Sequence, residues 1–210
     1  MIRVLIADDH PIVRQGIQKT IEANADMRVE AEAVDAQQTL DRAGLDSIDL
    51  VLLDLSMPGA DGLDVLKDLK RRRPLLPVLV LTMHSEEQFA IRSLKAGASG
   101  YLTKDTVPDE LVRAIRTVVG GRHYISSTLG DRLAASLTDG SAPSQHERLS
   151  DREYQVFRRI AVGRTSREIS AELALSVKTV ATYRARVLEK MGMRTNAELV
   201  SYAVRNRLAD

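Results

Sequence analysis

The sequence has no cysteine among its 210 residues. Disulfide bonds and metal sites built on thiolates are therefore excluded, and the composition fits a reducing compartment. No apolar run approaches the roughly 20 residues that a membrane-spanning helix needs. Met1 leads directly into a strand-like segment that ends in two aspartates, which is unlike a signal peptide. We expect a soluble, cytoplasmic protein with no membrane association.

The sequence also has almost no net charge, +1 at pH 7, but its charges are unevenly distributed. Residues 146–210 carry 13 Lys and Arg against 8 Asp and Glu, whereas residues 1–145 carry 17 against 21. An acidic first part and a basic second part indicate two domains, of which the second is a candidate for binding nucleic acid. Chance scatter of surface charge would explain these counts equally well, so the motifs must decide.

Short apolar runs alternate with longer amphipathic runs over residues 1–120. Such alternation is typical of βαβ units that build a parallel sheet. We expect an α/β fold with a doubly wound, five-stranded parallel sheet. The expected strands are 2–7, 28–34, 49–53, 77–81 and 99–102, and the expected helices are 11–24, 36–44, 62–72, 86–96 and 108–119.

The remainder of the chain follows a different pattern. Residues 138–144 are polar and rich in turn formers, as in a linker. Residues 149–208 show a helical pattern with no convincing strand. We therefore expect an α/β domain at 1–121, a linker at 122–147 with room for one short helix, and a small all-helical domain at 148–210.

Three carboxylates follow two of the expected strands. Asp8 and Asp9 end the first apolar run, and Asp54 ends the third. Ligands of parallel sheets bind at the carboxyl ends of the strands, where these side chains would meet. Because the three carboxylates repel one another, a hard cation such as Mg²⁺ is their natural partner. Taken alone, Asp8 is better explained as a helix N-cap.

Two further polar residues follow expected strands. Thr82 follows the fourth apolar run, and Lys104 lies just past the fifth. A hydroxyl and an ammonium beside a carboxylate–metal cluster are suited to bind an anion that is delivered to the metal. The combination indicates phosphoryl transfer to a carboxylate, with the cation and Lys104 balancing charge in the transition state.

Four motifs contain these residues, and they occur in a characteristic order. They are Ala7-Asp8-Asp9-His10-Pro11, Asp54-Leu55-Ser56-Met57-Pro58-Gly59 with Gly62, Leu81-Thr82, and Gly100-Tyr101-Leu102-Thr103-Lys104. Over about residues 1–120 they resemble the receiver domain of two-component response regulators. The resemblance implies a flavodoxin-like fold. It departs at Asp105, where many receivers have proline.

The resemblance implies a role for each motif residue. Asp54 matches the phosphoacceptor, and Thr82 and Lys104 match the pair that binds phosphoryl oxygens. Tyr101 matches an aromatic switch, although an ordinary half-buried sheet aromatic fits equally well. The implied Mg²⁺ ligands are Asp8, Asp9, Asp54 and the backbone carbonyl of Ser56.

Two loop residues are hypothesised to tune the lifetime of the phosphate. Ser56 and His84 lie two residues past Asp54 and Thr82, beside the expected path of attacking water. An ordinary solvent-facing role explains both residues equally well.

Residues 149–208 contain the signals of a helix-turn-helix. Ser150 with Glu153 three residues later predicts a capped helix start, and Gly163 predicts its end. A second helix at 165–173, a tight turn and a third helix at 177–191 follow. The third helix is expected to pack inward through Val180, Val187, Leu188 and Met191.

The other face of helix 177–191 carries small residues between basic ones. Such a face can enter a major groove, with cations on phosphates and small side chains at base edges or thymine methyls. A solvated helix with ordinary cations is the alternative. The expected DNA contacts are Lys178, Thr179, Ala181, Thr182, Arg184, Ala185 and Arg186.

The second domain also carries a resemblance. Its residues include Leu149-Ser150-Asp151-Arg152-Glu153, Glu168-Ile169-Ser170, Leu175-Ser176-Val177-Lys178-Thr179-Val180 and Leu188-Glu189-Lys190-Met191. They resemble the LuxR-type helix-turn-helix, which together with a receiver is the arrangement of the NarL/FixJ family. The sequence departs at Tyr183, where many members have histidine.

The combined resemblance implies a transcriptional regulator controlled by phosphorylation, with Mg²⁺ as its cofactor. The implied partners are a sensor histidine kinase, promoter DNA and, as a further candidate, RNA polymerase. A homodimer is expected in the phosphorylated or DNA-bound form, aided by helix 195–206. The protein is not expected to be an enzyme, although a receiver assists its own phosphorylation and dephosphorylation.

Two other functions use the same residues. An aspartyl-phosphate phosphatase or transferase would need an acid/base aspartate two residues beyond Asp54, where the sequence has Ser56. A DNA-binding protein with an unphosphorylated, degenerate receiver would not need the intact set of Asp9, Asp54, Thr82 and Lys104.

Overall fold

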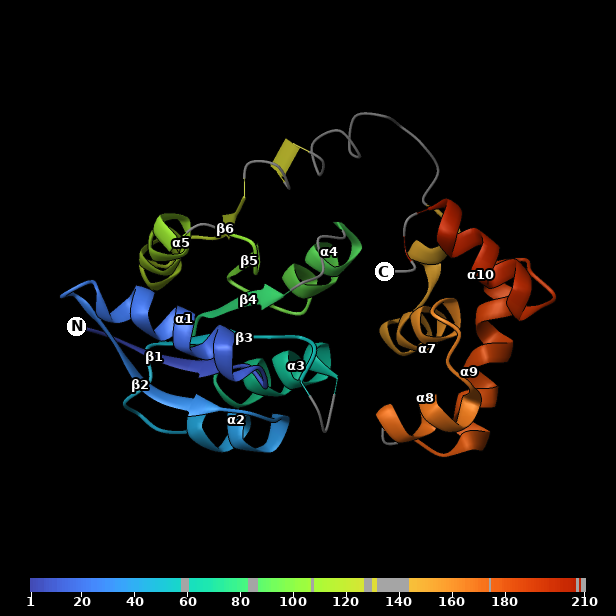
Figure 1. Cartoon of the computed structure of the whole chain (residues 1–210), viewed down its shortest axis with the longest axis horizontal. Coiled ribbons are helices and arrows are strands. Elements are labelled where there is room, and N and C mark those ends of the chain that lie inside the picture. Colours follow the sequence, from blue (N-terminus) through green and yellow to red (C-terminus); the bar gives the residue numbers. More distant parts are fainter. Residues whose placement is uncertain are drawn as a thin grey trace. The chain divides into compact units, whose positions relative to one another are not determined.

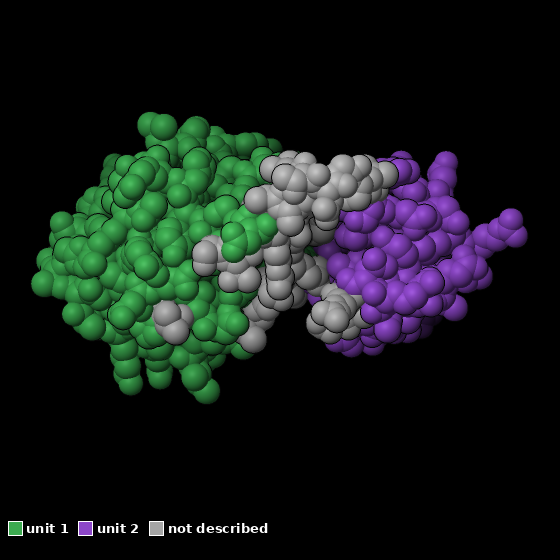
Figure 2. Space-filling view, turned by 90° about the horizontal axis from the view of Figure 1, so that it is seen from above, with its two compact units in different colours: residues 1–138 green, residues 139–210 purple. Residues whose placement is uncertain are grey.

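The computed structural model describes residues 1–57, 61–82, 87–106, 108–126, 130–131, 144–173, 175–206 and 208. The chain forms two compact units, Met1–Thr138 and Asp139–Asp210 (Figures 1 and 2). None of the described helices is both long enough and apolar enough to cross a membrane.

The first unit is built on a parallel sheet with the strand order β2-β1-β3-β4-β5-β6 (Figure 1). The order reverses between β1 and β3, which makes their carboxyl ends the switch point where ligands bind. Its strands are β1 (Ile2–Ala7), β2 (Met27–Ala33), β3 (Leu50–Leu53), β4 (Val78–Thr82), β5 (Gly100–Thr103) and β6 (Tyr124–Ile125). Its helices are α1 (Pro11–Glu22), α2 (Ala36–Ala43), α3 (Gly62–Arg72), α4 (Glu87–Lys95) and α5 (Pro108–Val119).

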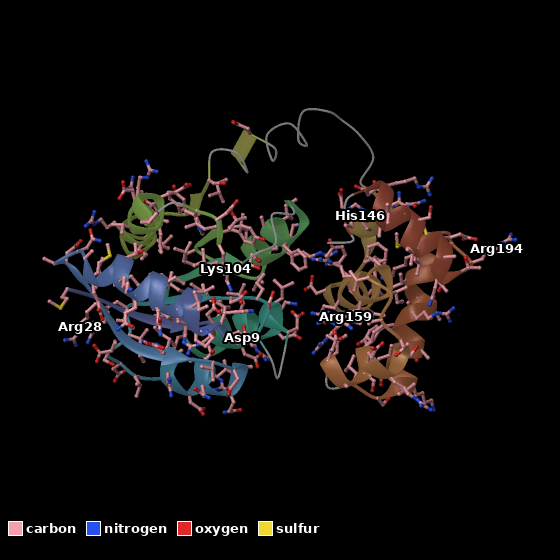
Figure 3. All side chains as sticks on the ribbon, in the orientation of Figure 1. Asp9, Arg28, Lys104, His146, Arg159 and Arg194 are labelled. Carbon is pink, nitrogen blue, oxygen red and sulfur yellow. The ribbon has the colours of Figure 1, made fainter. Side chains whose placement is uncertain are left out.

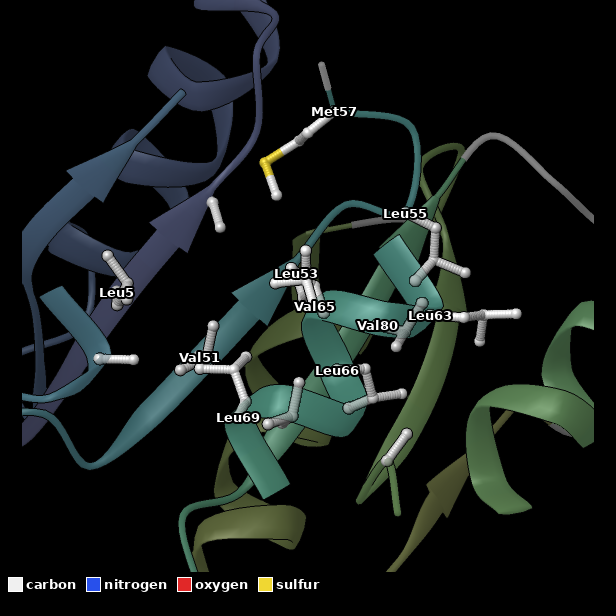
Figure 4. Packing of buried hydrophobic residues seen from close by; sticks show 14 of the residues in the cluster. Leu5, Val51, Leu53, Leu55, Met57, Leu63, Val65, Leu66, Leu69 and Val80 are labelled. Atoms are coloured by element: carbon white, nitrogen blue, oxygen red, sulfur yellow. The ribbon is translucent and has the colours of Figure 1, made fainter. Parts of the chain in front are cut away.

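Helices cover both faces of this sheet, as the nearly continuous apolar strands require. In β1, Leu5 belongs to the core under α2, α3 and α4, whereas Val4 and Ile6 belong to the core under α1 and α5. The first core includes Leu63 and Leu66 of α3, which pack toward the strands in Figure 4. Two buried faces hold the strand ends in fixed positions, so the side chains beyond them are also fixed.

The sheet has six strands in the structure, so the expected number of five was wrong. Strand β6 pairs parallel with β5, with Tyr124 opposite Gly100. A Cβ at position 100 would lie 2.7 Å from the Tyr124 carbonyl oxygen, so glycine permits this close approach. A strand of two residues is too short to give an alternating pattern in the sequence, which explains why it was missed.

The second unit is helical. It contains the 3₁₀ helix η1 (Gln145–Arg148), α7 (Asp151–Ala161), α8 (Ser166–Glu172), α9 (Val177–Lys190) and α10 (Asn196–Arg205). Capping boxes start α7 and α8, through Ser150 with Glu153 and through Thr165 with Glu168. Gly163 has a φ of +82°, which favours glycine after the end of α7.

Candidate functional site

Three charged side chains meet at the carboxyl ends of β1, β3 and β5. The Nζ atom of Lys104 lies 2.6 Å from Asp8 Oδ2 and 2.7 Å from Asp54 Oδ2. All three side chains are at most 4% exposed. Figure 3 shows Lys104 and the neighbouring Asp9 in this unit. Because β1 and β3 are adjacent and β5 lies two strands from β3, the topology itself brings these residues together.

The charges in this site perturb one another. Burial raises the pKa of the Asp54 carboxyl, and the hydrogen bond from Lys104 opposes this rise. Burial also lowers the pKa of Lys104, but hydrogen bonds to Asp54 and Asp8 outweigh it and the pKa is raised. The ammonium therefore stays charged and compensates two carboxylates that would otherwise repel each other in a buried site.

Backbone groups hold the two buried carboxylates in place. The Ser56 N–H donates to Asp54 Oδ1 at 3.0 Å, and the His10 N–H donates to Asp8 Oδ1 at 2.8 Å. The Arg14 side chain donates to the Asp8 carbonyl oxygen at 2.8 Å, tying α1 to the end of β1. The side-chain orientations are thus set by the turns that follow β1 and β3.

The residues present fit a hard divalent cation. Asp8, Asp9, His10 and Asp54 each offer one ligand atom, and these atoms lie within 4.8 Å of one another. Asp9 Oδ1 is shielded from solvent, and His10 Nδ1 lies 2.8 Å from it. Carboxylate oxygens are the ligands that Mg²⁺ prefers. His10 was not assigned from the sequence, although it directly follows the aspartate pair.

Two other predicted residues lie on the strands beside Lys104. Thr82 ends β4, is fully buried, and its carbonyl oxygen accepts the Lys104 N–H at 2.9 Å. Tyr101 on β5 is only 2% exposed, within the core that α2, α3 and α4 cover. Ser56 lies two residues past Asp54 in the turn after β3, and it is exposed. His84, together with Pro58 and Gly59 of the second motif, lies outside the described residues.

Helix α9 has one buried and one exposed face. Val180, Val187 and Met191 are buried, and Leu188 is half-buried. The predicted contacts that are exposed are Lys178, Ala181, Thr182, Ala185 and Arg186. They recur at helical spacing, so they form one continuous face.

The two other predicted DNA contacts, Thr179 and Arg184, are half-buried and contact other residues of the same unit. The Thr179 hydroxyl lies 2.8 Å from that of Ser176, the N-cap of α9. The Nε atom of Arg184 donates to Asn196 Oδ1 at 2.6 Å, which joins α9 to the start of α10. These two residues flank the exposed face and are anchored within the unit.

Family comparisons agree with both halves of this arrangement. Residues 4–116 match the response regulator receiver domain, and residues 147–203 match the bacterial regulatory proteins of the luxR family. A receiver fold with an acidic cluster at its strand ends, followed by a helix-turn-helix unit, defines the class of transcriptional response regulators. The chain belongs to the NarL/FixJ family of these regulators, and it is a DNA-binding signalling protein.

Similar proteins extend over the full chain. The response regulator UvrY of Escherichia coli strain K12 is 36% identical, with the alignment covering 100% of this chain and 97% of UvrY. RcsB from Salmonella enterica serovar Typhimurium, bound to promoter rprA with phosphomimetic BeF₃⁻, is 30% identical with a TM-score of 0.73. The match covers 96% of this chain and 97% of RcsB. A structure of two RcsB dimers bound to two parallel DNAs is 30% identical with a TM-score of 0.62. This match covers 97% of the present chain and 98% of the RcsB chain.

Proposed function

We propose that Asp54 is the phosphoacceptor of this regulator and that a sensor histidine kinase is the donor. The observation that carries the proposal is the buried bridge from Lys104 to Asp8 and Asp54. A buried ion pair contributes little to stability in general, so its placement at the switch point of the sheet favours a functional role. The domains that we propose are a receiver at 1–121, a linker at 122–147 and a DNA-binding domain at 148–210.

The proposed step is a phosphoryl transfer. An oxygen of the Asp54 carboxylate forms a bond to phosphorus while the P–N bond of a phosphohistidine breaks. The electron pair of that bond stays on the imidazole nitrogen of the donor. Asp8, Asp9, Asp54 and the Ser56 carbonyl would hold Mg²⁺, and the ion would neutralise charge on the phosphoryl oxygens. In the proposed dephosphorylation, a water oxygen forms a bond to the same phosphorus while the bond from phosphorus to the Asp54 oxygen breaks, which releases inorganic phosphate and restores the Asp54 carboxylate.

Lys104 and Thr82 would bind the transferred group. Lys104 already lies within 2.7 Å of Asp54, and its ammonium is positioned to pair with phosphoryl oxygens. Thr82 on the next strand can donate its hydroxyl to the same group. The phosphoryl group adds about −1.5 to −2 charges at neutral pH by analogy with phosphoserine. Tyr101, on the strand that leads to Lys104, would then follow the position of Thr82.

The output would be DNA binding through α9. The exposed face of α9 would meet a major groove, with Lys178 and Arg186 at phosphates and Thr182 at base edges. The RcsB structures contain dimers and promoter DNA, which supports a dimer on DNA for this chain. Helix α10 is proposed to aid dimerisation of the DNA-bound form, and RNA polymerase is a proposed further partner. Converting an active state of about 1% population to about 99% requires about 5.5 kcal/mol of differential stabilisation. The phosphoryl group, the dimer contacts and the DNA contacts would each supply part of this free energy.

A direct experiment tests this function. The full chain is incubated with Mg²⁺ and a small phosphodonor such as acetyl phosphate, and its mass and DNA affinity are measured. We expect one phosphoryl group on the wild type, none on Asp54→Ala, and one on Asp105→Ala, an exposed carboxylate close to the site. DNA affinity should rise with phosphorylation only where the mass increases.

Two outcomes would replace the proposal. No mass increase on the wild type would favour a receiver that works without phosphorylation. Continuous hydrolysis of the donor without DNA binding would favour a phosphatase or transferase.

A further inference from the structure

Arg14 of α1 joins three elements next to the acidic cluster. Its Nη1 atom donates to the Asp8 carbonyl oxygen at 2.8 Å, and its Nε atom donates to Glu32 Oε2 on β2 at 2.9 Å. The side chain of Arg14 is only 14% exposed. A guanidinium presents its donors in a rigid planar fork, so bonds to two different elements fix its direction. Arg14 is therefore held in one orientation at the carboxyl end of β1.

The backbone of Asp8 is held on both sides. Its N–H donates to the Ala33 carbonyl oxygen at the end of β2 at 3.0 Å, and its carbonyl oxygen accepts the bond from Arg14. That carbonyl belongs to the planar peptide that leads to Asp9, so its orientation sets the direction in which the Asp9 side chain leaves the backbone. The Asp8 carboxylate accepts the His10 N–H at 2.8 Å. Through one carbonyl, Arg14 thus acts on both neighbouring aspartates.

Glu32 gives the charge of Arg14 a partner. An uncompensated guanidinium beside a cation site would repel the ion, and it would also be attracted to the nearby carboxylates. The ion pair with Glu32 offsets this charge and directs the guanidinium at the Asp8 carbonyl. Because the Glu32 side chain is 40% exposed, the ion pair contributes little to the stability of the fold. Its effect should therefore appear in the site rather than in unfolding.

We propose that Arg14 and Glu32 are positioning residues for the cation site, and that they act through the Asp8 carbonyl rather than as ligands. This rests on the proposed binding of Mg²⁺ by Asp8, Asp9 and Asp54, and it adds what fixes the first two of these carboxylates. Groups that orient metal ligands in this way typically change metal affinity about 10- to 100-fold when they are removed.

The sign of one substitution separates positioning from charge. If Arg14 acted only through its charge, removing it would raise Mg²⁺ affinity, because a positive charge beside the cation would be lost. We expect the opposite, a fall of about tenfold in Arg14→Met, measured by calorimetry on the full chain. Glu32→Gln should also lower the affinity. The double variant should match Arg14→Met, because Glu32 then has no guanidinium to orient.

Arg3 and Asp49 provide the matched control. They form an ion pair toward the other end of β1, with Arg3 Nη2 2.9 Å from Asp49 Oδ1. Asp49→Asn removes a link of the same kind from the same unit, and it should keep the wild-type affinity for Mg²⁺. An equal fall in Asp49→Asn would assign the effect to a general loosening of the unit. That result, or an unchanged or raised affinity in Arg14→Met, would overturn the proposal.

Amide exchange in EDTA reports the geometry without any ion. The His10 N–H donates to Asp8 Oδ1 after β1, and the Ser56 N–H donates to Asp54 Oδ1 after β3. Arg14→Met should speed hydrogen exchange of the His10 amide severalfold and leave that of Ser56 unchanged, as measured by NMR. An unchanged His10 amide, or equal acceleration at both amides, would contradict a role confined to the turn after β1.

The phosphorylation assay distinguishes this role from the proposed function. Arg14→Met should need about tenfold more Mg²⁺ for half-maximal phosphoryl incorporation, while the rate at saturating Mg²⁺ returns to that of the wild type. A wild type that binds Mg²⁺ but gains no phosphoryl group would contradict the proposed function, and calorimetry would still decide the role of Arg14. A wild type that binds no Mg²⁺ would overturn both.

Discussion

Lys104 is the residue on which the electrostatics of the receiver depend. Removing it leaves Asp8 and Asp54 side by side without a compensating charge in a site that water barely reaches. Breaking a buried ion pair from one side costs about 3 kcal/mol or more. We expect Lys104→Met to lose about that much free energy of unfolding in EDTA. Added Mg²⁺ should restore part of it, as measured by urea denaturation.

A double variant checks the cause of that loss. In Asp54→Asn, Lys104→Met the asparagine removes one of the two uncompensated charges. The double variant should therefore lose less stability than the sum of the single variants. Strict additivity would mean that the bridge is not responsible.

A single substitution at Lys178 tests whether the exposed face of α9 binds DNA. It is exposed on α9, one turn from Thr182, whose hydroxyl donates to the Lys178 carbonyl oxygen at 3.1 Å. A phosphate contact contributes about one unit to the slope of log affinity against log salt. Lys178→Ala should lower this slope by about one in DNA titrations, whereas Arg122→Ala, an exposed cation of the first unit, should leave it unchanged. Equal slopes for Lys178→Ala and wild type would argue for the solvated-helix alternative.

At the scale of secondary-structure elements, Glu153 joins two helices of the second unit. It accepts the Ser150 N–H at 2.7 Å, which caps α7, and Lys190 Nζ at 2.6 Å from the end of α9. Its side chain is 4% exposed. We expect Glu153→Ala to cost about 2 kcal/mol, because a cap and a charge-assisted bond are lost together. Hydrogen exchange of the α9 amides would report this for the second unit separately.

The capping box of α8 provides the matched control. Glu168 occupies the same position there, but it is exposed and caps Thr165 without a buried partner. Glu168→Ala should therefore destabilise the unit less than Glu153→Ala. A loss of equal size would show that capping, rather than the link to α9, accounts for the effect.

The ion pair between Arg3 on β1 and Asp49 just before β3 should make the stability of the first unit depend on pH. Arg3 donates from its backbone and its guanidinium at 2.9 Å, and its side-chain hydrogen bond is the main reason that the pKa of Asp49 falls to about 2. Burial opposes this shift. Because the folded-state pKa is lowered, the stabilisation is complete above the unfolded pKa of 3.8 and is lost as the pH falls toward 2.

The lowered pKa of Asp49 predicts a measurable difference in the free energy of unfolding between wild type and Asp49→Asn. Both side chains are about one-third exposed, so solvent screening reduces the contribution to about 1 kcal/mol. Asp49→Asn should lose that amount at pH 7, and the gap to wild type should shrink between pH 5 and pH 3 in urea titrations. A gap that stays constant with pH would assign the loss to packing.

The sequence predicted the longer elements because their patterns are repeated. Strand β1 and helices α3 and α5 have the expected bounds, and the other expected helices differ by only a few residues at their ends. Strand β6 was missed because its pairing with β5 depends on a close approach at Gly100. That approach is a tertiary contact, which a local sequence pattern does not reveal. Asp8, Asp54 and Lys104 were expected at converging strand ends, and the structure brings these three side chains together. The direction of the His10 imidazole, by contrast, depends on the turn after β1.

At the scale of the whole molecule, the chain joins an acidic unit that receives a signal to a basic unit that binds DNA. Two routes can connect them. The proposed phosphorylation of Asp54 would either favour dimerisation or release the α9 face for DNA within one copy of the chain. The two routes differ in what they do to a single half-site, because a dimer needs two half-sites about one helical turn apart.

The final prediction uses this difference. Duplexes selected in vitro are prepared with one half-site or with two, and the affinity of the full chain is measured before and after phosphorylation at constant salt. We expect phosphorylation to raise affinity for the double site about tenfold or more, while the single half-site changes little, because dimerisation turns the second contact into an intramolecular one. An equal gain on both duplexes would instead assign the control to release of the α9 face. Asp54→Ala serves as the reference in both titrations, since a phosphodonor should change neither of its affinities.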